Sequence, residues 1–174
     1  MASLPTELFH HICSFLTPAD LAVLSRVSSN WRDVSQSILY RHLSLSSLVK
    51  NVACVFSLAH MPHLACLVRS FTIRLKTYNA DFCHTLALAV TNLSELTSLE
   101  VYADQAASWI MQNETTYPHL QSFACSFHLD PHLIHFLNKA DSITTLAIDA
   151  IPISDVNLPL PSIALPCLSL RLPS

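Results

Sequence analysis

A short apolar pattern that recurs along most of the chain is the feature that most constrains its fold. The pattern is apolar-x-x-apolar-x-apolar, and its five copies are Val68/Phe71/Ile73, Leu96/Leu99/Val101, Leu120/Phe123/Cys125, Ile143/Leu146/Ile148 and Leu165/Leu168/Leu170. The central residues are 28, 24, 23 and 22 positions apart. Alternation such as Leu99-Glu100-Val101 suits a short strand with one buried face. Intervals of this size are typical of repeat proteins.

The segments between these copies contain helical patterns. Residues 81–90 place Phe82, Leu86 and Ala89 on one helical face, and Ala106, Trp109 and Ile110 indicate a short helix in the next segment. Asp130-Pro131 is a typical helix start. A further helix is expected from residue 46 or 47 to Met61, where Pro62 ends it. One strand and one helix per unit predict a right-handed α/β solenoid whose parallel strands line a concave surface.

These units resemble leucine-rich repeats, although they are irregular. The Asn or Cys that follows the strand in that family is replaced here by Lys76, Asp104, His128, Ile151 and Pro173. A less regular α/β layer is therefore the alternative. Three prolines in segment 149–164 exclude a regular helix there, and no polar capping repeat follows the fifth copy. We therefore expect residues 46–174 to form a leucine-rich-repeat-like domain that is incomplete or uncapped at its C-terminal end.

The first residues of the chain have a different pattern. Leu4-Pro5 opens a helix with an apolar stripe at Leu8, Ile12, Phe15 and Leu16. Thr17-Pro18-Ala19-Asp20 then ends this helix and begins a second one, with Thr17 as the expected cap. A third helix begins at Ser28 or Ser29 and carries Trp31, Val34 and Ile38 on one side. The pattern alone predicts three short amphipathic helices.

This order of residues resembles the F-box. The matching residues are Leu4, Pro5, Glu7, Leu8, Ile12, Leu16, Pro18, Asp20, Leu21, Leu24, Val27, Trp31 and Arg32, while Ser28 stands where many F-boxes have Cys. The resemblance implies an F-box domain over residues 1–45 that binds a Skp-type adaptor and, through it, a cullin. It places Leu4, Pro5, Leu8, Ile12, Leu16, Pro18 and Leu21 mainly at the adaptor interface. It places Leu24, Val27 and Trp31 mainly in the core of the domain and at its edge.

Composition excludes several other classes of function. The 174 residues include no glycine, which excludes the glycine-rich phosphate loops, the dinucleotide fingerprint and the nucleophile elbow. Apolar residues make up 51% of the chain and charged residues only 12%, so we expect a partner to cover part of its apolar surface. The net charge is −3, and neither half has a basic stripe for nucleic acid.

The cysteines and the N-terminus indicate an intracellular protein. The six cysteines form no C-x-x-C pair and lie in apolar runs, as expected of reduced thiols in the cytosol or nucleus. No basic segment followed by an apolar core is present at the N-terminus, so no signal peptide is expected. Residues 51–68 carry no formal charge, but Asn51, His60, Pro62 and His63 interrupt them, which disfavours a membrane span.

Ten histidines raise the alternatives of a metal site or a catalytic site. His60-x-x-His63-x-x-Cys66 has ligand-like spacing but lacks a second well-spaced pair. The group His128, His132 and His135 has no carboxylate or cysteine to complete it. Cys83 and His84 are adjacent, and neighbouring residues on a helix point apart, which is poor geometry for a nucleophile and its base. We therefore expect no enzyme activity, no metal and no cofactor.

The sequence thus predicts a substrate-recognition subunit of a Skp–cullin–F-box ubiquitin ligase. The F-box would bind the adaptor, and the repeats would bind a target protein for ubiquitination. Two alternatives remain: a non-degradative protein-interaction scaffold, and a truncated remnant of a longer F-box protein. The identity of the target, and any need for its phosphorylation, is not encoded in a readable way.

Overall fold

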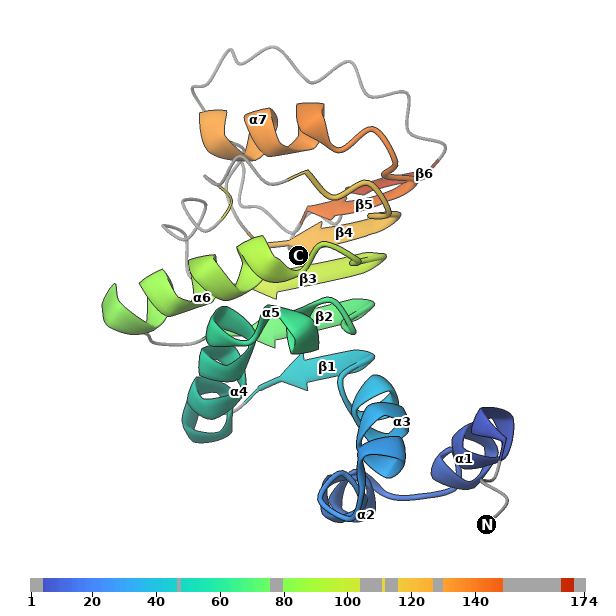
Figure 1. Cartoon of the computed structure of the whole chain (residues 1–174). Helices are drawn as coiled ribbons and strands as arrows, with labels where there is room; N and C mark the ends of the chain where they lie inside the picture. Colours follow the sequence, from blue (N-terminus) through green and yellow to red (C-terminus); the bar gives the residue numbers. More distant parts are fainter. Residues whose placement is uncertain are drawn as a thin grey trace.

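The chain folds into a group of three helices followed by a parallel sheet that carries helices on one face (Figure 1). A computed structural model describes residues 5–46, 48–75, 80–103, 111, 116–126, 130–148 and 167–170. The first three helices are α1 (Thr6–Cys13), α2 (Pro18–Leu24) and α3 (Ser29–Leu39). The predicted mixed α/β class and the three N-terminal helices are confirmed.

Every strand of the sheet pairs in parallel with the next strand along the chain. The strands are β1 (His42–Leu45), β2 (Ser70–Arg74), β3 (Ser98–Tyr102), β4 (Ser122–Cys125), β5 (Thr145–Ile148) and β6 (Cys167–Leu170), and their spatial order is the order of the sequence. The central residues of the five apolar copies are direct partners in this register, from Phe71 through Leu99, Phe123 and Leu146 to Leu168. The pattern therefore predicted β2 to β6 correctly.

The first strand, β1, was not predicted. Leu43 is the register partner of Phe71, 28 residues later, and Tyr40/Leu43/Leu45 has the same apolar spacing as the five copies. This copy lies within residues 1–45, which the resemblance assigned to the F-box, so it was not interpreted as part of the repeat. The predicted division between residues 45 and 46 falls after β1, whereas the sheet already begins with β1.

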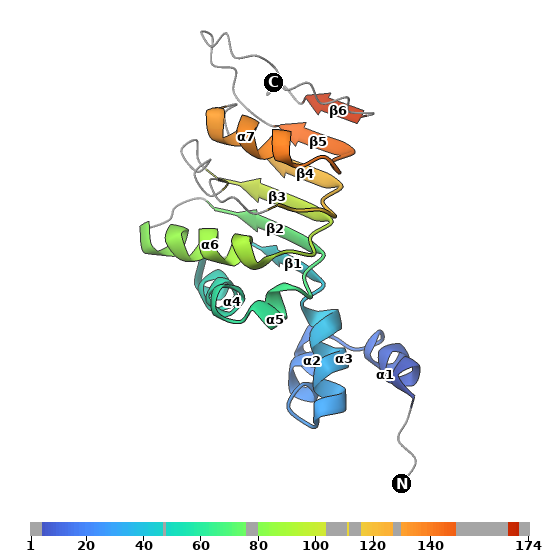
Figure 2. The same cartoon turned by 45° about the horizontal axis from the view of Figure 1, so that its top comes forward.

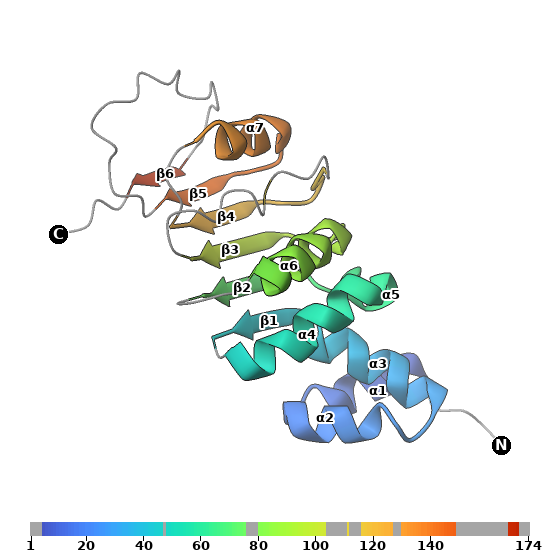
Figure 3. The same cartoon turned by 90° about the vertical axis from the view of Figure 1, so that its left-hand side faces the viewer.

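In the part of the chain that the structure describes, four helices connect the strands and lie on the same face of the sheet (Figures 2 and 3). They are α4 (Leu48–His60), α5 (Pro62–Ala65), α6 (Ala80–Asn92) and α7 (Pro131–Lys139). Pro62 ends the long helix as expected, and a short helix, α5, lies between it and the expected strand, β2. Asp130 caps α7 as predicted, because its Oδ1 accepts a hydrogen bond from the Leu133 N–H at 2.8 Å. The patterns at 106–110 and 149–164 lie outside the described residues.

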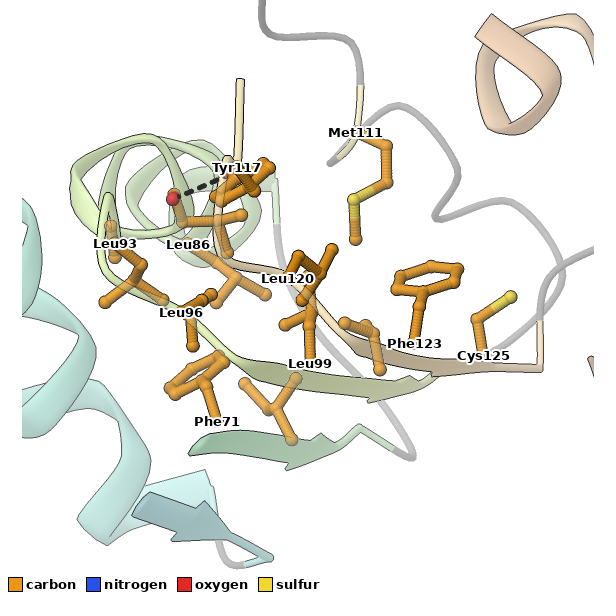
Figure 4. Close-up of a cluster of buried hydrophobic side chains, with 14 of the residues drawn as sticks. Phe71, Leu86, Leu93, Leu96, Leu99, Met111, Tyr117, Leu120, Phe123 and Cys125 are labelled. Atoms are coloured by element: carbon orange, nitrogen blue, oxygen red, sulfur yellow. Dashed lines mark hydrogen bonds between the residues drawn. The ribbon is translucent and has the colours of Figure 1, made fainter. Parts of the chain in front are cut away.

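The main core lies between the helices and the sheet. The central residues Phe71, Leu99 and Phe123 are fully buried, and Leu146 is nearly so. Figure 4 shows Phe71, Leu99 and Phe123 on the side of the strands that faces Leu86 and Tyr117. Full burial of side chains of this size contributes about 1.5–3 kcal/mol each. The four apolar copies from Val68 to Ile148 therefore belong to one continuous core.

The same hydrogen-bond arrangement recurs where the strands begin. One backbone carbonyl oxygen accepts two N–H groups, from the residue before the next strand and from the first residue of that strand, at 2.8–3.0 Å. The acceptors are the carbonyls of Arg41, Arg69, Thr97 and Gln121. This repeated contact holds the beginnings of successive strands in register although the segments between them differ in length.

Polar side chains join the return segments to one another. The Asn92 amide donates to the carbonyls of Leu58 and Ala59 at the end of α4, at 3.0 and 2.9 Å. The Tyr117 hydroxyl donates to the carbonyl of Val90 in α6 at 2.9 Å. Carbonyl groups near a helix end have no partner within the helix. The Asn92 amide thus supplies a donor to two carbonyls at the end of α4. The Tyr117 hydroxyl adds a second donor to the Val90 carbonyl, which also accepts from the Leu93 N–H at 3.1 Å.

Candidate functional site

The three N-terminal helices enclose a small core of their own. Phe9, Cys13, Leu21 and Val34 are buried in it, and the ring of Trp31 lies edge-on to Phe9 with 4.4 Å between ring centroids. Phe9 and Cys13 are one helical turn apart on α1, so this face of α1 points inward. A core of this size leaves much of the apolar surface of the three helices uncovered.

A capping box fixes the beginning of α2. The Asp20 N–H donates to Thr17 Oγ1 at 3.3 Å, and the Thr17 N–H donates to Asp20 Oδ2 at the same distance. Pro18 occupies the first helical turn, where no N–H is needed. The expected cap at Thr17 is confirmed, and Asp20 stands where a Glu usually completes the capping box. This arrangement sets the direction in which α2 leaves α1.

The outer face of α1 exposes a stripe of large apolar side chains. Leu8, Ile12 and Phe15 are 46%, 43% and 75% exposed, and their spacing of four and three residues places them on one side of the helix and of the turn that ends it. Val23 and Val27 are also well exposed. Five large apolar side chains exposed within so short a segment are typical of a surface that a partner covers.

Most residues predicted at the adaptor interface are accessible. Pro5, Leu8, Ile12 and Pro18 are exposed, and Leu16 is half-buried against the small core. Leu4 lies outside the described residues. Accessibility makes these side chains available to a partner; their binding to an adaptor stays a prediction.

Two of the predicted placements need correction. Leu21 was expected at the interface, but it is 3% exposed and belongs to the small core, because it lies on the side of α2 that packs against the other two helices. Val27 was expected in the core or at its edge, but it is 62% exposed. Leu24 and Trp31 are half-buried and pack against the core, as expected for its edge.

Five residues were missing from the predicted set. Phe15 and Val23 are among the most exposed large apolar side chains, and Phe9, Cys13 and Val34 are core residues. The spacing from Ile12 to Phe15 indicated that Phe15 continues the exposed stripe. Phe9 lies 100° from Leu8 on the helix, and the apolar pattern alone did not indicate which of these two faces points inward.

The F-box-like helices join the sheet without a linker. Leu39 packs against the small core, and the next residue, Tyr40, packs against the main core, as does Leu43 in β1. Burial raises the pKa of the Tyr40 hydroxyl, and the nearby Cys54 of α4 raises it further. Burial also raises the pKa of the Cys54 thiol. Two consecutive residues thus belong to two different cores, which restricts movement between them.

The histidines and cysteines singled out in the sequence have other contacts. His60 stacks on Phe56 and donates from Nδ1 to the Phe56 carbonyl at 2.9 Å, while the Cys66 thiol donates to the His63 carbonyl. Within the described ranges, no three histidine, cysteine or acidic side chains are grouped so that they could hold a metal ion. His128 lies outside those ranges. Burial raises the pKa of Cys83, which disfavours the reactive thiolate.

Comparison with known protein families identifies the N-terminal helices. The family model described as F-box-like matches residues 1–46. These residues therefore form an F-box-like domain, and such domains generally bind Skp-type adaptors. No curated protein matches the chain. None of the described helices is both long enough and apolar enough to span a membrane.

Proposed function

We propose that this chain is a substrate-recognition subunit of a Skp–cullin–F-box ubiquitin ligase. The observation that carries the proposal is the exposed stripe of Leu8, Ile12 and Phe15 on a domain that matches the F-box-like family. The stripe would bind the Skp-type adaptor, which would connect the chain to a cullin. The sheet and its helices would bind the target protein.

The exposed stripe has the chemistry of a protein interface. Aromatic and large aliphatic side chains at the centre of an interface contribute most of the binding free energy when a partner removes them from water. Leu8 and Ile12 retain nearly half of their surface, and Phe15 three quarters, for such contact. None of the three is charged, so an apolar groove or helix face on the adaptor is the expected counterpart.

We further propose that the sheet and its helices form an irregular leucine-rich-repeat solenoid. Three features support this assignment: the parallel pairing of each strand with the next, the fully buried apolar copies and the repeated carbonyl contact where the strands begin. Repeats of this kind present an extended surface to a protein ligand.

The contribution of the chain to ubiquitination would be positional. It would hold the target near the activated ubiquitin and so raise the local concentration of the target, with no bond chemistry of its own. The direct connection from α3 to β1 supports this role. Because Leu39 and Tyr40 are fixed in adjacent cores, the distance from the adaptor to the target would vary little.

Co-expression with a Skp-type adaptor tests the proposal. The wild-type chain should elute with the adaptor as a one-to-one complex in size-exclusion chromatography. The double substitution Leu8→Asp/Ile12→Asp places two charges in the proposed interface, and we expect it to abolish co-elution. Both side chains are exposed, so circular dichroism should show an unchanged helix content.

The matched control is Phe56→Asp, which places one charge on an exposed apolar side chain of α4, outside the F-box-like domain. This variant should still elute with the adaptor. Unchanged co-elution of Leu8→Asp/Ile12→Asp, or loss of the complex in Phe56→Asp alone, would contradict the assignment of the interface.

A further inference from the structure

The face of the sheet opposite the helices is lined by polar and small side chains. We call it the open face, since none of the described helices lies against it (Figure 3). One row across the strands consists of hydroxyl side chains in direct register: Ser70, Ser98, Ser122 and Thr145. These hydroxyl groups can donate and accept hydrogen bonds, so the open face suits a polar ligand.

Where the strands end, the open face carries an arginine that contacts an aromatic ring. Arg74 is the last residue of β2 and the register partner of Tyr102, the last residue of β3. The guanidinium carbon of Arg74 lies 4.8 Å from the centroid of the Tyr102 ring. Arginine stacks on aromatic rings through its flat face, and its N–H groups then point outward in the plane of the guanidinium. The contact with Tyr102 therefore restricts the conformations of the Arg74 side chain before any ligand arrives.

Arg74 has no carboxylate partner within the part of the chain that the structure describes. In that part of the chain, Arg69 forms an ion pair with Glu95, with 2.7 Å between Nη1 and Oε2. This pair lies before the first residues of β2 and β3, whereas Arg74 is the last residue of β2. The acidic residue on the open face is Glu100, which pairs in register with Thr72 rather than with Arg74. Arg74 is exposed, so its positive charge and its donors remain available to a partner.

We propose that the open face binds an acidic segment of the target protein, with an Asp or Glu of that segment on Arg74. A carboxylate matches the fork of guanidinium donors and can accept two parallel hydrogen bonds. Tyr102 reduces the entropy lost on binding, because it restricts the Arg74 side chain beforehand. This inference rests on the proposed function, in which the sheet is the part that holds the target.

Selection from a display library of random peptides tests this inference without a known target. The bait is the full chain in complex with the adaptor, as wild type and as Arg74→Glu. Peptides selected by the wild type should be enriched in Asp and Glu, and those selected by Arg74→Glu should be enriched in Lys and Arg instead. For one selected acidic peptide, Arg74→Glu should raise the Kd about two- to fivefold or more, as expected when an exposed ion pair is lost.

The matched control is Arg41→Glu, which makes the same change of charge at an exposed arginine that precedes β1. It should select the same peptides as the wild type. Identical selection by wild type and Arg74→Glu, a preference for phosphorylated over acidic versions of the peptides, or selection of no peptide by the wild type would each overturn the inference. Elution of Arg74→Glu with the adaptor is measured in parallel, so a failure of this inference is distinguishable from a failure of the proposed function.

Discussion

At the scale of single residues, Tyr117 shows how a polar group can be buried without destabilising the fold. The side chain is 5% exposed, and its hydroxyl donates to the Val90 carbonyl. Figure 4 shows this hydrogen bond at the top of the main core. Burial raises the pKa of Tyr117 well above its ordinary value of 10.0, because the charged phenolate would lose its hydration. The neutral form is therefore strongly favoured in the folded state.

We expect Tyr117→Phe to lower the free energy of unfolding at neutral pH by about 1 kcal/mol, because the hydrogen bond from the Tyr117 hydroxyl to the Val90 carbonyl is lost, while that carbonyl keeps the Leu93 N–H as a donor. The difference between wild type and variant should shrink above about pH 10. Above that pH the unfolded wild-type chain releases the Tyr117 proton while the folded chain retains it. The free energy of unfolding of the wild type therefore falls, whereas Tyr117→Phe has no such proton to release. Urea unfolding at a series of pH values measures both effects.

A difference between the two proteins that stays constant with pH would contradict the burial argument. A large loss of stability at neutral pH, of several kcal/mol, would instead indicate that the ring of Tyr117 has repacked.

At the scale of helices and strands, the ends of the helices depend on contacts with their neighbours. Asn92, the last residue of α6, donates two hydrogen bonds to the carbonyls of Leu58 and Ala59 near the end of α4. These bonds connect two return segments that are more than thirty residues apart in the sequence. The end of α4 is thus stabilised from outside the helix.

Asn92→Ala should destabilise the chain by about 1–3 kcal/mol, since two carbonyls in a partly buried position lose their donor. Hydrogen–deuterium exchange should become faster at the end of α4 than elsewhere. Ser57→Ala is the matched control, because Ser57 is half-buried and its hydroxyl donates within α4, to the Ala53 carbonyl, in an exposed hydrogen bond. Equal effects of the two substitutions would show that the connection between α4 and α6 contributes nothing.

The elements themselves were largely predictable from the sequence, and their contacts were not. The apolar copies around Phe71, Leu99 and Phe123 predicted their strands because each copy repeats one strand-forming unit. The inward or outward direction of Leu21 and Val27 could not be read in the same way. Every side of a short helix in a small domain carries apolar residues, and only packing selects the buried side.

The Arg74–Tyr102 contact shows a second limit of sequence reasoning. The two residues are 28 positions apart, and only the register of β2 and β3 brings them together. An exposed arginine after a strand has no distinctive spacing. Such a site becomes visible when strand pairing is known.

At the scale of the whole molecule, the F-box-like domain and the sheet are connected as one unit. The junction is the step from Leu39, in the small core, to Tyr40, in the main core. A loss of packing in one core would therefore affect the other core through Tyr40.

Tyr40→Ala should weaken the coupling between the two cores. We expect calorimetry of the wild type to show one cooperative transition, and that of the variant to show two, because the truncated side chain no longer packs against the main core. Leu8→Ala, at an exposed position, is the control and should keep a single transition. One unchanged transition in Tyr40→Ala would indicate that the backbone alone couples the two cores.

The order of the strands also determines how the chain can assemble. Each of the described strands pairs only with a strand whose first residue lies 22 to 28 positions away, and none of these pairings joins the first strand to the last. The entropic cost of closing each such loop is similar, because it grows slowly with loop length. As the chain emerges from the ribosome, β2 can pair with β1 before β3 has been synthesised. The neighbour with which each later strand pairs has thus already been synthesised when that strand emerges.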